Sequence, residues 1–213
     1  EPIYGYYRTN DEWVLRRQSE MLANALVDTV FTDNTNGQYT WRDSYIPLFN
    51  TWGQAQRDGV EVPKVSFMLP FAATDDAVAQ MKMLYTDIYR DGKYSSLWFW
   101  FDGKPMLMAH QSKLDKNDGL QSEIRSFFTF RNNYPGYINK FPEYRDWGWL
   151  SVYPQAKYYL NYDNEKAGIV EQISVGVSQN HNFVTHQLSA MNGPNNTGRT
   201  YTSKGYDTSE NAI

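Results

Sequence analysis

The chain of 213 residues contains no cysteine, which excludes disulfides, Cys-ligated zinc and thiolate catalysis together. No hydrophobic run approaches the ~20 residues of a transmembrane helix, so we expect no membrane span. Basic residues do not predominate either, because 20 Lys and Arg stand against 24 Asp and Glu, a net charge of -4. A chain without a basic stripe is a poor candidate for binding nucleic acid.

Several catalytic motifs are also missing. The sequence has no Gly-x-Ser-x-Gly elbow, no P-loop and no Gly-x-Gly-x-x-Gly after its first predicted strand, so acyl transfer, phosphoryl transfer and dinucleotide chemistry are unsupported. We therefore expect no cofactor. The histidines His110, His181 and His186 lack metal-protease spacing. A metal-dependent hydrolase that uses His110, His181 and Asp33 stays open as an alternative.

Aromatic residues, in contrast, are abundant. They make up 16% of the chain, with 17 Tyr and 7 Trp. Tyr and Trp combine an apolar face with a polar tip, which suits a surface that binds sugars as well as a Tyr-rich core and rim. Composition alone leaves both interpretations open.

Predicted strands and helices alternate through the first half of the chain. We expect strands at 3–7, 28–32 and 64–69, each followed by an amphipathic helix. Asn10 is the expected N-cap of the first helix, which ends near Ala25, and Gly59 ends the second, which covers 45–57. Thr74 caps the third, which ends at Gly92. Three such units predict right-handed parallel crossovers.

The second half of the chain predicts four more strands. Asp102-Gly103 between the apolar runs 96–101 and 105–109 is a strong hairpin signal, with one arm in the main sheet. A helix at 118–126 and strands at 127–130, 147–152 and 171–177 follow. The expected fold is an α/β (β/α)8 TIM-type barrel within one domain, with seven units in 1–181. The polar stretch 182–213 is expected as a loop or tail, with the eighth strand missing and supplied by a further segment or a second polypeptide.

Side chains at the carboxyl ends of these strands are the site candidates, because α/β sheets bind ligands there. Asp33 ends a buried strand and is the candidate catalytic residue, with an Asx-type turn as the competing structural interpretation. The candidate substrate-binding residues are polar or aromatic side chains at the same edge: Tyr7, Arg8, Asn34, Asn36, Phe71, His110, Arg131, Tyr153, Gln155, Gln179, Asn180 and His181. Such a set can bind sugar hydroxyls and stack on sugar rings.

Other acidic residues are less well placed. Asp102 lies in the hairpin turn and Glu171 begins a predicted strand, so both belong at the opposite end of the sheet. Glycoside hydrolysis needs two carboxyl groups, ~5–5.5 Å apart for retention or ~6.5–9.5 Å apart for inversion. Since Asp33 is the one well-placed carboxylate, we expect the second to lie outside this chain, and these residues alone to be inactive.

Several segments resemble, in order, bacterial secreted proteins of the glycoside hydrolase family 71/99-like group. They are Gly5-Tyr6-Tyr7, the stretch 27–36, Pro63-Lys64-Val65, the stretch 97–105 and the stretch 172–180. The resemblance implies a (β/α)8 barrel, an endo-acting glycosidase of α-mannans, α-glucans or related polysaccharides, and a secreted, periplasmic or cell-surface location. It carries over Asp33, Asn36, Gln179, Asn180 and His181 as cleft residues. Such proteins continue into a strand that ends in a Trp-Asn-Glu-Trp-like segment, which this sequence lacks. A non-catalytic glycan-binding barrel is the alternative.

Overall fold

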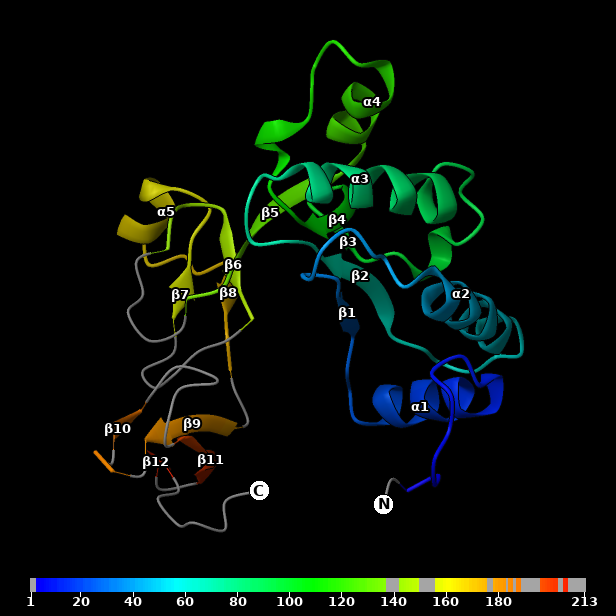
Figure 1. Cartoon of the computed structure of the whole chain (residues 1–213), viewed down its shortest axis with the longest axis horizontal. Helices are drawn as coiled ribbons and strands as arrows, with labels where there is room; N and C mark the ends of the chain where they lie inside the picture. The colour runs from blue at the N-terminus through cyan, green and yellow to red at the C-terminus, as the bar shows by residue number, and fades with distance from the viewer. Residues whose placement is uncertain are drawn as a thin grey trace. The chain divides into compact units, whose positions relative to one another are not determined.

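The computed structural model describes residues 3–136, 142–149, 156–175, 178–182, 184–185, 187–188, 196–202 and 205–206 (Figure 1). The chain divides into two compact units, Glu1–Arg131 and Asn132–Ile213. The sequence placed its boundary after residue 181, whereas this division falls within a strand.

A parallel sheet alternating with helices forms the first unit, and this part of the predicted fold is confirmed. The order along the chain is α1 (Glu12–Asn24), β1 (Thr29–Asp33), α2 (Arg42–Arg57), β2 (Lys64–Met68), α3 (Asp75–Leu84), β3 (Trp100–Phe101), β4 (Lys104–Met108), α4 (Gly119–Phe127) and β5 (Thr129–Tyr134). The strands pair in the order β1-β2-β4-β5-β6, where β6 is Asp146–Gly148, and all these pairs are parallel. Strand β3 adds to β4 in antiparallel fashion.

Local sequence signals explain where the helices begin. Thr74 Oγ1 accepts a hydrogen bond from the amide of Ala77 at the start of α3, and Asp118 accepts one from Gln121 at the start of α4. Both caps satisfy an amide that the first helical turn leaves unpaired. For α1 the expected cap was wrong by one residue. Asp11, not Asn10, accepts from the amide of Val14.

The predicted hairpin is present. Asp102 and Gly103 have φ of 54° and 77°, which is the left-handed pair of conformations that a two-residue hairpin turn requires. The turn joins β3 to β4, and β4 then pairs with β2 and β5, so one arm belongs to the main sheet as expected.

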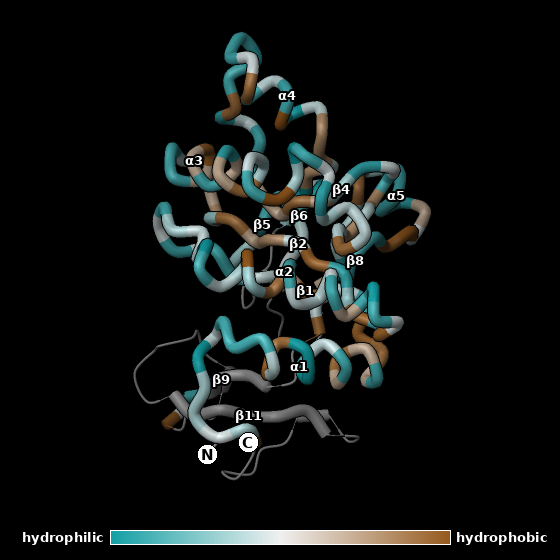
Figure 2. Tube along the Cα trace, turned by 90° about the vertical axis from the view of Figure 1, so that its right-hand side faces the viewer, coloured by the Kyte–Doolittle hydropathy of each residue, from teal (hydrophilic) through white to brown (hydrophobic). Residues whose placement is uncertain are grey.

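The core of the first unit lies between the sheet and the helices. Alternate strand residues such as Phe67, Leu107 and Phe130 pack against Met81 of α3 and Ile124 of α4, and Phe67, Leu107, Met81 and Ile124 are fully buried. Hydrophobic and hydrophilic stretches alternate along α3 and α4, as expected for helices with one buried face (Figure 2). The strand residues that alternate with these core positions project from the other face of the sheet.

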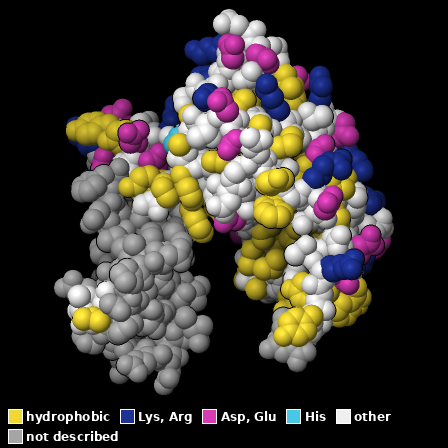
Figure 3. All heavy atoms as spheres, in the orientation of Figure 1, with side chains coloured by type: hydrophobic (Ala, Val, Ile, Leu, Met, Phe, Trp, Pro, Cys, Tyr) yellow, Lys and Arg dark blue, Asp and Glu magenta, His cyan; other side chains and the backbone are white. Residues whose placement is uncertain are grey.

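The first predicted strand, 3–7, is not a strand. Gly5 has a φ of 66°, which interrupts an extended conformation. The ring of Tyr4 instead packs edge-on against Trp13 at 5.3 Å, and its hydroxyl donates to the sulfur of Met21 on α1. Ile3 in this segment and Trp13 on α1 are exposed. Figure 3 shows exposed hydrophobic side chains at the lower right of the molecule.

The second unit departs further from the predicted barrel. After β6 come β7 (Lys157–Tyr158), α5 (Tyr162–Lys166) and β8 (Gln172–Ile173), and β7 and β8 form an antiparallel pair. The strand predicted at 171–177 was therefore wrong in direction, and within 171–175 it covers Gln172–Ile173 alone, while residues 176–177 lie outside the described residues. Its alternating pattern predicts a strand with its apolar side chains buried, but Ile173 and Val175 are exposed and Ser174 between them is buried. Of the strand predicted at 147–152, residues 150–152 lie outside the described residues.

A four-stranded antiparallel sheet lies where a polar tail was expected. It consists of β9 (Ser178–Asn182), β10 (Gln187–Leu188), β11 (Asn196–Thr202) and β12 (Gly205–Tyr206) in the order β10-β9-β11-β12. Thr and Tyr in β11 suit a strand, and polar composition alone does not exclude an antiparallel ladder.

Candidate functional site

The carboxyl edge of the first unit's sheet carries one row of side chains across four strands. Asp33 is in register with Met68, Met68 with Met108, and Met108 with Arg131. Neighbours in register project from the same face, so Asp33 and Arg131 share the face that lies opposite the helices. Three strand spacings separate them by about 14 Å.

Backbone hydrogen bonds hold this edge in place. The amide of Asn34 donates to the carbonyl of Met68, and the amide of Leu69 donates to the carbonyl of Met108, both at 2.9 Å. The amide of Ala109 donates to the carbonyl of Arg131 at 2.8 Å. The ladder therefore continues beyond the row, and the side chains at its ends stand on a rigid support.

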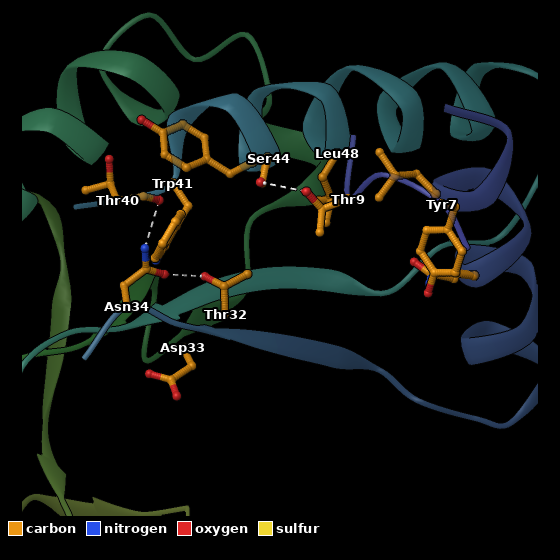
Figure 4. A pocket seen from close by; sticks show the side chains of 12 residues that line it. Tyr7, Thr9, Thr32, Asp33, Asn34, Thr40, Trp41, Ser44 and Leu48 are labelled. Atoms are coloured by element: carbon orange, nitrogen blue, oxygen red, sulfur yellow. Dashed lines mark hydrogen bonds between the residues drawn. The ribbon is translucent and has the colours of Figure 1, made fainter. Parts of the chain in front are cut away.

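Asp33 is exposed at the end of β1 and points to the opposite side of the strand from Thr32 and Asn34 (Figure 4). Its Oδ1 accepts a hydrogen bond from the amide of Thr35 at 3.0 Å, which is an Asx-type turn. Its Oδ2 makes no hydrogen bond or ion pair with the residues that the structure describes. The turn therefore orients the carboxylate and leaves one oxygen available to a ligand.

A cavity of about 300 Å³ lies on the Thr32 and Asn34 side of β1, and Asp33 contributes to its lining at the end of the strand while its carboxylate points to the other side (Figure 4). It is lined by hydroxyl, amide and aromatic side chains from residues 7–9, α1, β1 and the start of α2: Tyr7, Thr9, Leu15, Gln18, Thr32, Asp33, Asn34, Thr40, Trp41, Ser44, Tyr45 and Leu48. Mostly apolar walls with a few placed polar groups are typical of small-molecule sites.

Hydrogen bonds between the lining residues fix the polar part of the cavity. Thr32 donates to Oδ1 of Asn34, and Nδ2 of Asn34 donates to the carbonyl of Thr40, both at 2.8 Å (Figure 4). The hydroxyls of Thr9 and Ser44 lie 3.2 Å apart. Asn34 is buried with both ends of its amide engaged, so it shapes the loop after β1 rather than facing a ligand.

Tyr45, on one wall of the cavity, is an uncharged hydrogen-bond donor beside an ion pair. The hydroxyl of Tyr45 donates to Asp87 at 2.5 Å, and Nε of Arg42 donates to the same carboxylate oxygen at 2.8 Å. Burial, together with Asp87, raises the pKa of Tyr45 well above its usual range. Tyr45 therefore remains a neutral donor, and the ion pair fixes the first turn of α2 to the residues after α3.

The other predicted binding residues of the first unit differ in exposure. Arg8 and Asn36 are exposed, while Phe71 and His110 are half-buried. Arg131 is buried, with its guanidinium 5.1 Å from the ring centre of Phe101 and a hydrogen bond to the carbonyl of Phe130. A cation against an aromatic face is held in a defined position, which suits a group at a ligand site.

The predicted site residues of the second unit are placed differently. Tyr153 and Gln155, like His186, lie outside the described residues. Gln179, Asn180 and His181 belong to β9, which pairs with β11 and β10 in antiparallel fashion. Their expected position at the carboxyl end of a parallel strand was wrong, because the strand that precedes them is the short antiparallel β8.

The described residues contain neither a group of candidate metal ligands nor a helix that could span a membrane. Over those residues, no group of three or more His, Asp or Glu side chains could hold a metal ion. Within the same ranges, no helix combines the length and the apolar character needed to cross a bilayer.

Sequence reasoning missed the residues that build the cavity around Asp33. Trp41, Thr40 and Ser44 come from the loop between β1 and α2 and from the first turn of α2. Trp41 lies in the loop that follows β1, so the rule that such loops form the site could have identified it. Gln80, which holds that loop from α3, carries no such signal.

Comparison with protein-family models, curated proteins and solved structures gives no match. The candidate site therefore has to be interpreted from its own chemistry.

Proposed function

We propose that this protein is a secreted, periplasmic or cell-surface glycoside hydrolase, endo-acting on a polysaccharide, with its parallel sheet forming part of a (β/α)8 barrel. One observation carries the proposal. An exposed carboxylate with an unengaged oxygen, Asp33, stands at the carboxyl edge of the sheet, at the end of a strand whose other side lines a cavity of hydroxyl and aromatic groups. Sugars offer hydroxyls and apolar ring faces together, and such a cavity matches both.

Asp33 would be one of the two carboxylates of the reaction, and the walls would bind the sugar. Tyr7 and Trp41 offer exposed ring faces, while Thr32 and Ser44 offer hydroxyls. Arg131 lies on the same face of the sheet as Asp33 and could bind hydroxyl or acidic groups further along. The resemblance to the family 71/99-like group points to the same chemistry.

A second carboxylate has to come from elsewhere. Among the described residues that line the cavity, Asp33 is the one acidic residue, and both hydrolytic mechanisms require a pair. We therefore propose that the partner carboxylate lies outside these residues, on the part that completes the barrel. The same observation favours a second candidate function, a glycan-binding barrel without catalysis.

Binding and hydrolysis separate the two functions. The chain is titrated with soluble α-mannan, α-glucan, β-glucan and xylan, and release of reducing ends is measured on the protein together with any polypeptide that completes it. Asp33→Asn is compared with Asp28→Asn, which changes an exposed Asp at the opposite end of β1.

The hydrolase proposal expects binding of one glycan class by all three proteins and loss of hydrolysis in Asp33→Asn alone. Binding without hydrolysis in every protein supports the binding barrel instead. If none of the glycans binds or is cleaved, both functions are wrong.

A further inference from the structure

The loop between β1 and α2 is held from beneath by one buried side chain. Nε2 of Gln80, on α3, donates to the carbonyls of Asn34 at 2.9 Å and Gly37 at 2.6 Å, and it lies 3.4 Å from the carbonyl of Tyr39. Gln80 is fully buried. The side-chain amide of Asn34 adds a hydrogen bond to the carbonyl of Thr40. Side-chain amides therefore bind four carbonyls of one short loop, which fixes its backbone.

This rigid loop presents two large aromatic side chains to solvent. Tyr39 is 75% exposed and Trp41 is 61% exposed. Their ring centres lie 6.4 Å apart, with a tilt of 38° between the ring planes. Burial of the two rings contributes little to folding, so stability does not explain why the loop carries them.

Trp41 also breaks the local rules for its position. It is the N-cap of α2 with φ 59° and ψ 48°, and its side chain makes no capping hydrogen bond. Asn, Asp, Ser or Thr would normally cap the helix, and a left-handed conformation is unfavourable for a bulky residue. A strained residue that the surroundings hold in place points to a role in binding.

Trp41 connects the exposed pair to the cavity. It lines that cavity together with Asp33, Thr40 and Ser44, and Figure 4 shows its ring beside Asn34 at the end of β1. The aromatic pair is thus continuous with the site where we place a sugar.

We infer that Tyr39 and Trp41 form a second sugar-stacking subsite beside the cavity. This inference rests on the proposed function and deepens it. A ligand that fills the cavity and also covers the pair spans more than a single sugar unit. The site therefore takes a glycan chain and discriminates against a monosaccharide.

The experiment is a titration of the full chain with linear α-linked mannose and glucose oligosaccharides of increasing length, starting from the monosaccharides. Trp41→Asn removes the ring and supplies a good N-cap that tolerates the left-handed conformation, so the variant should fold. Tyr39→Ser is a second, independent variant at an exposed position. Trp100→Thr is the matched control, because Trp100 is 52% exposed on β3 and is paired with the start of β4.

We expect affinity of the unaltered chain to rise from the monosaccharide to the short chains. Tyr39→Ser should lower affinity for the longer ligands about tenfold, as expected for removal of an aromatic anchor, with affinity for the monosaccharide little changed, because Tyr39 is not among the residues that line the cavity. Trp41→Asn should lower affinity at every length and most for the longer ligands, and Trp100→Thr should change neither.

Two results overturn the inference, and they are distinguishable. If the unaltered chain binds sugars equally well at every length, or if both ring variants leave the length dependence intact, the second subsite is wrong while the proposed function stands. If the unaltered chain binds no saccharide at all, the proposed function fails, and the subsite fails with it.

Discussion

Replacement of Gln80 by Met tests whether one buried amide supports the whole loop after β1. Met keeps the volume of the side chain and removes its hydrogen bonds to the carbonyls of Asn34 and Gly37. An unpaired buried carbonyl costs about 1–3 kcal/mol. The cost is largest at Asn34, because that residue is buried, whereas Gly37 lies at the surface and its carbonyl can bind water instead.

One gain offsets part of that loss. Oε1 of Gln80 is buried without a hydrogen-bond partner, so its removal returns about 1 kcal/mol. The net loss of unfolding free energy should be about 1 kcal/mol, which corresponds to a shift of about 0.5 M in the urea midpoint. Equilibrium unfolding followed by circular dichroism measures this shift.

Gln54→Met is the matched control. Gln54 is exposed on α2, and its amide donates to Asp58 at the surface. Its replacement should cost less than about 0.5 kcal/mol. Gln80 does not support the loop after β1 if the two variants unfold at the same urea concentration, or if amide exchange in residues 34–41 does not accelerate in Gln80→Met.

Three further predictions address the site and the fold. Asp33→Asn should leave stability nearly unchanged, because an Asn oxygen can still accept from the amide of Thr35, while the proposed hydrolysis should fall steeply. Unchanged turnover would remove Asp33 from the proposed reaction. Hydrogen bonds from Gln121 lower the pKa of Asp118, so its contribution to stability is complete above its unfolded pKa of about 4 and is lost as pH falls through the lower folded pKa. Asp118→Asn should flatten that acid dependence in unfolding experiments at pH 3 to 6, and an unaltered profile would assign the dependence to other groups. Gly103→Val should cost about 1–2 kcal/mol in thermal unfolding because φ is 77°, and an unchanged midpoint would contradict a left-handed turn.

Local signals predicted the parallel half of the fold. The hairpin follows from Asp102-Gly103 because few residue pairs accept positive φ twice, and α3 and α4 start where Thr74 and Asp118 can cap them. These signals depend on residues close together in the chain. They therefore predict local structure independently of the tertiary fold.

Tertiary contacts decided the places where prediction failed. Residues 3–7 read as a strand, but Tyr4 packs on Trp13 of α1 instead of joining the sheet. The alternation around Ile173 predicted a strand correctly, yet nothing in it distinguishes a parallel partner from the antiparallel β7. Pairing partners are long-range properties that local pattern does not encode.

In the candidate site, too, some residues could be predicted from the sequence and others could not. Asp33 could be found because it follows an apolar strand, and the rule about carboxyl ends applies to it directly. Gln80 could not be found, because it lies 46 residues from Asn34 in the chain and resembles any polar residue of a helix. Long-range contacts of this kind hold the loop that lines the cavity, so the cavity could not be predicted from local sequence.

Glycan binding at the carboxyl edge of the sheet is tested most directly by hydrogen–deuterium exchange of this chain with and without an excess of the α-linked mannose or glucose oligosaccharides proposed as ligands. Binding at this edge should slow exchange in residues 32–45, which contain Asp33 and Trp41, and leave residues 59–64 at the opposite end of the sheet unchanged. Protection at 59–64, or protection nowhere in the first unit, would contradict the claim that this protein binds glycans at the carboxyl edge of its sheet.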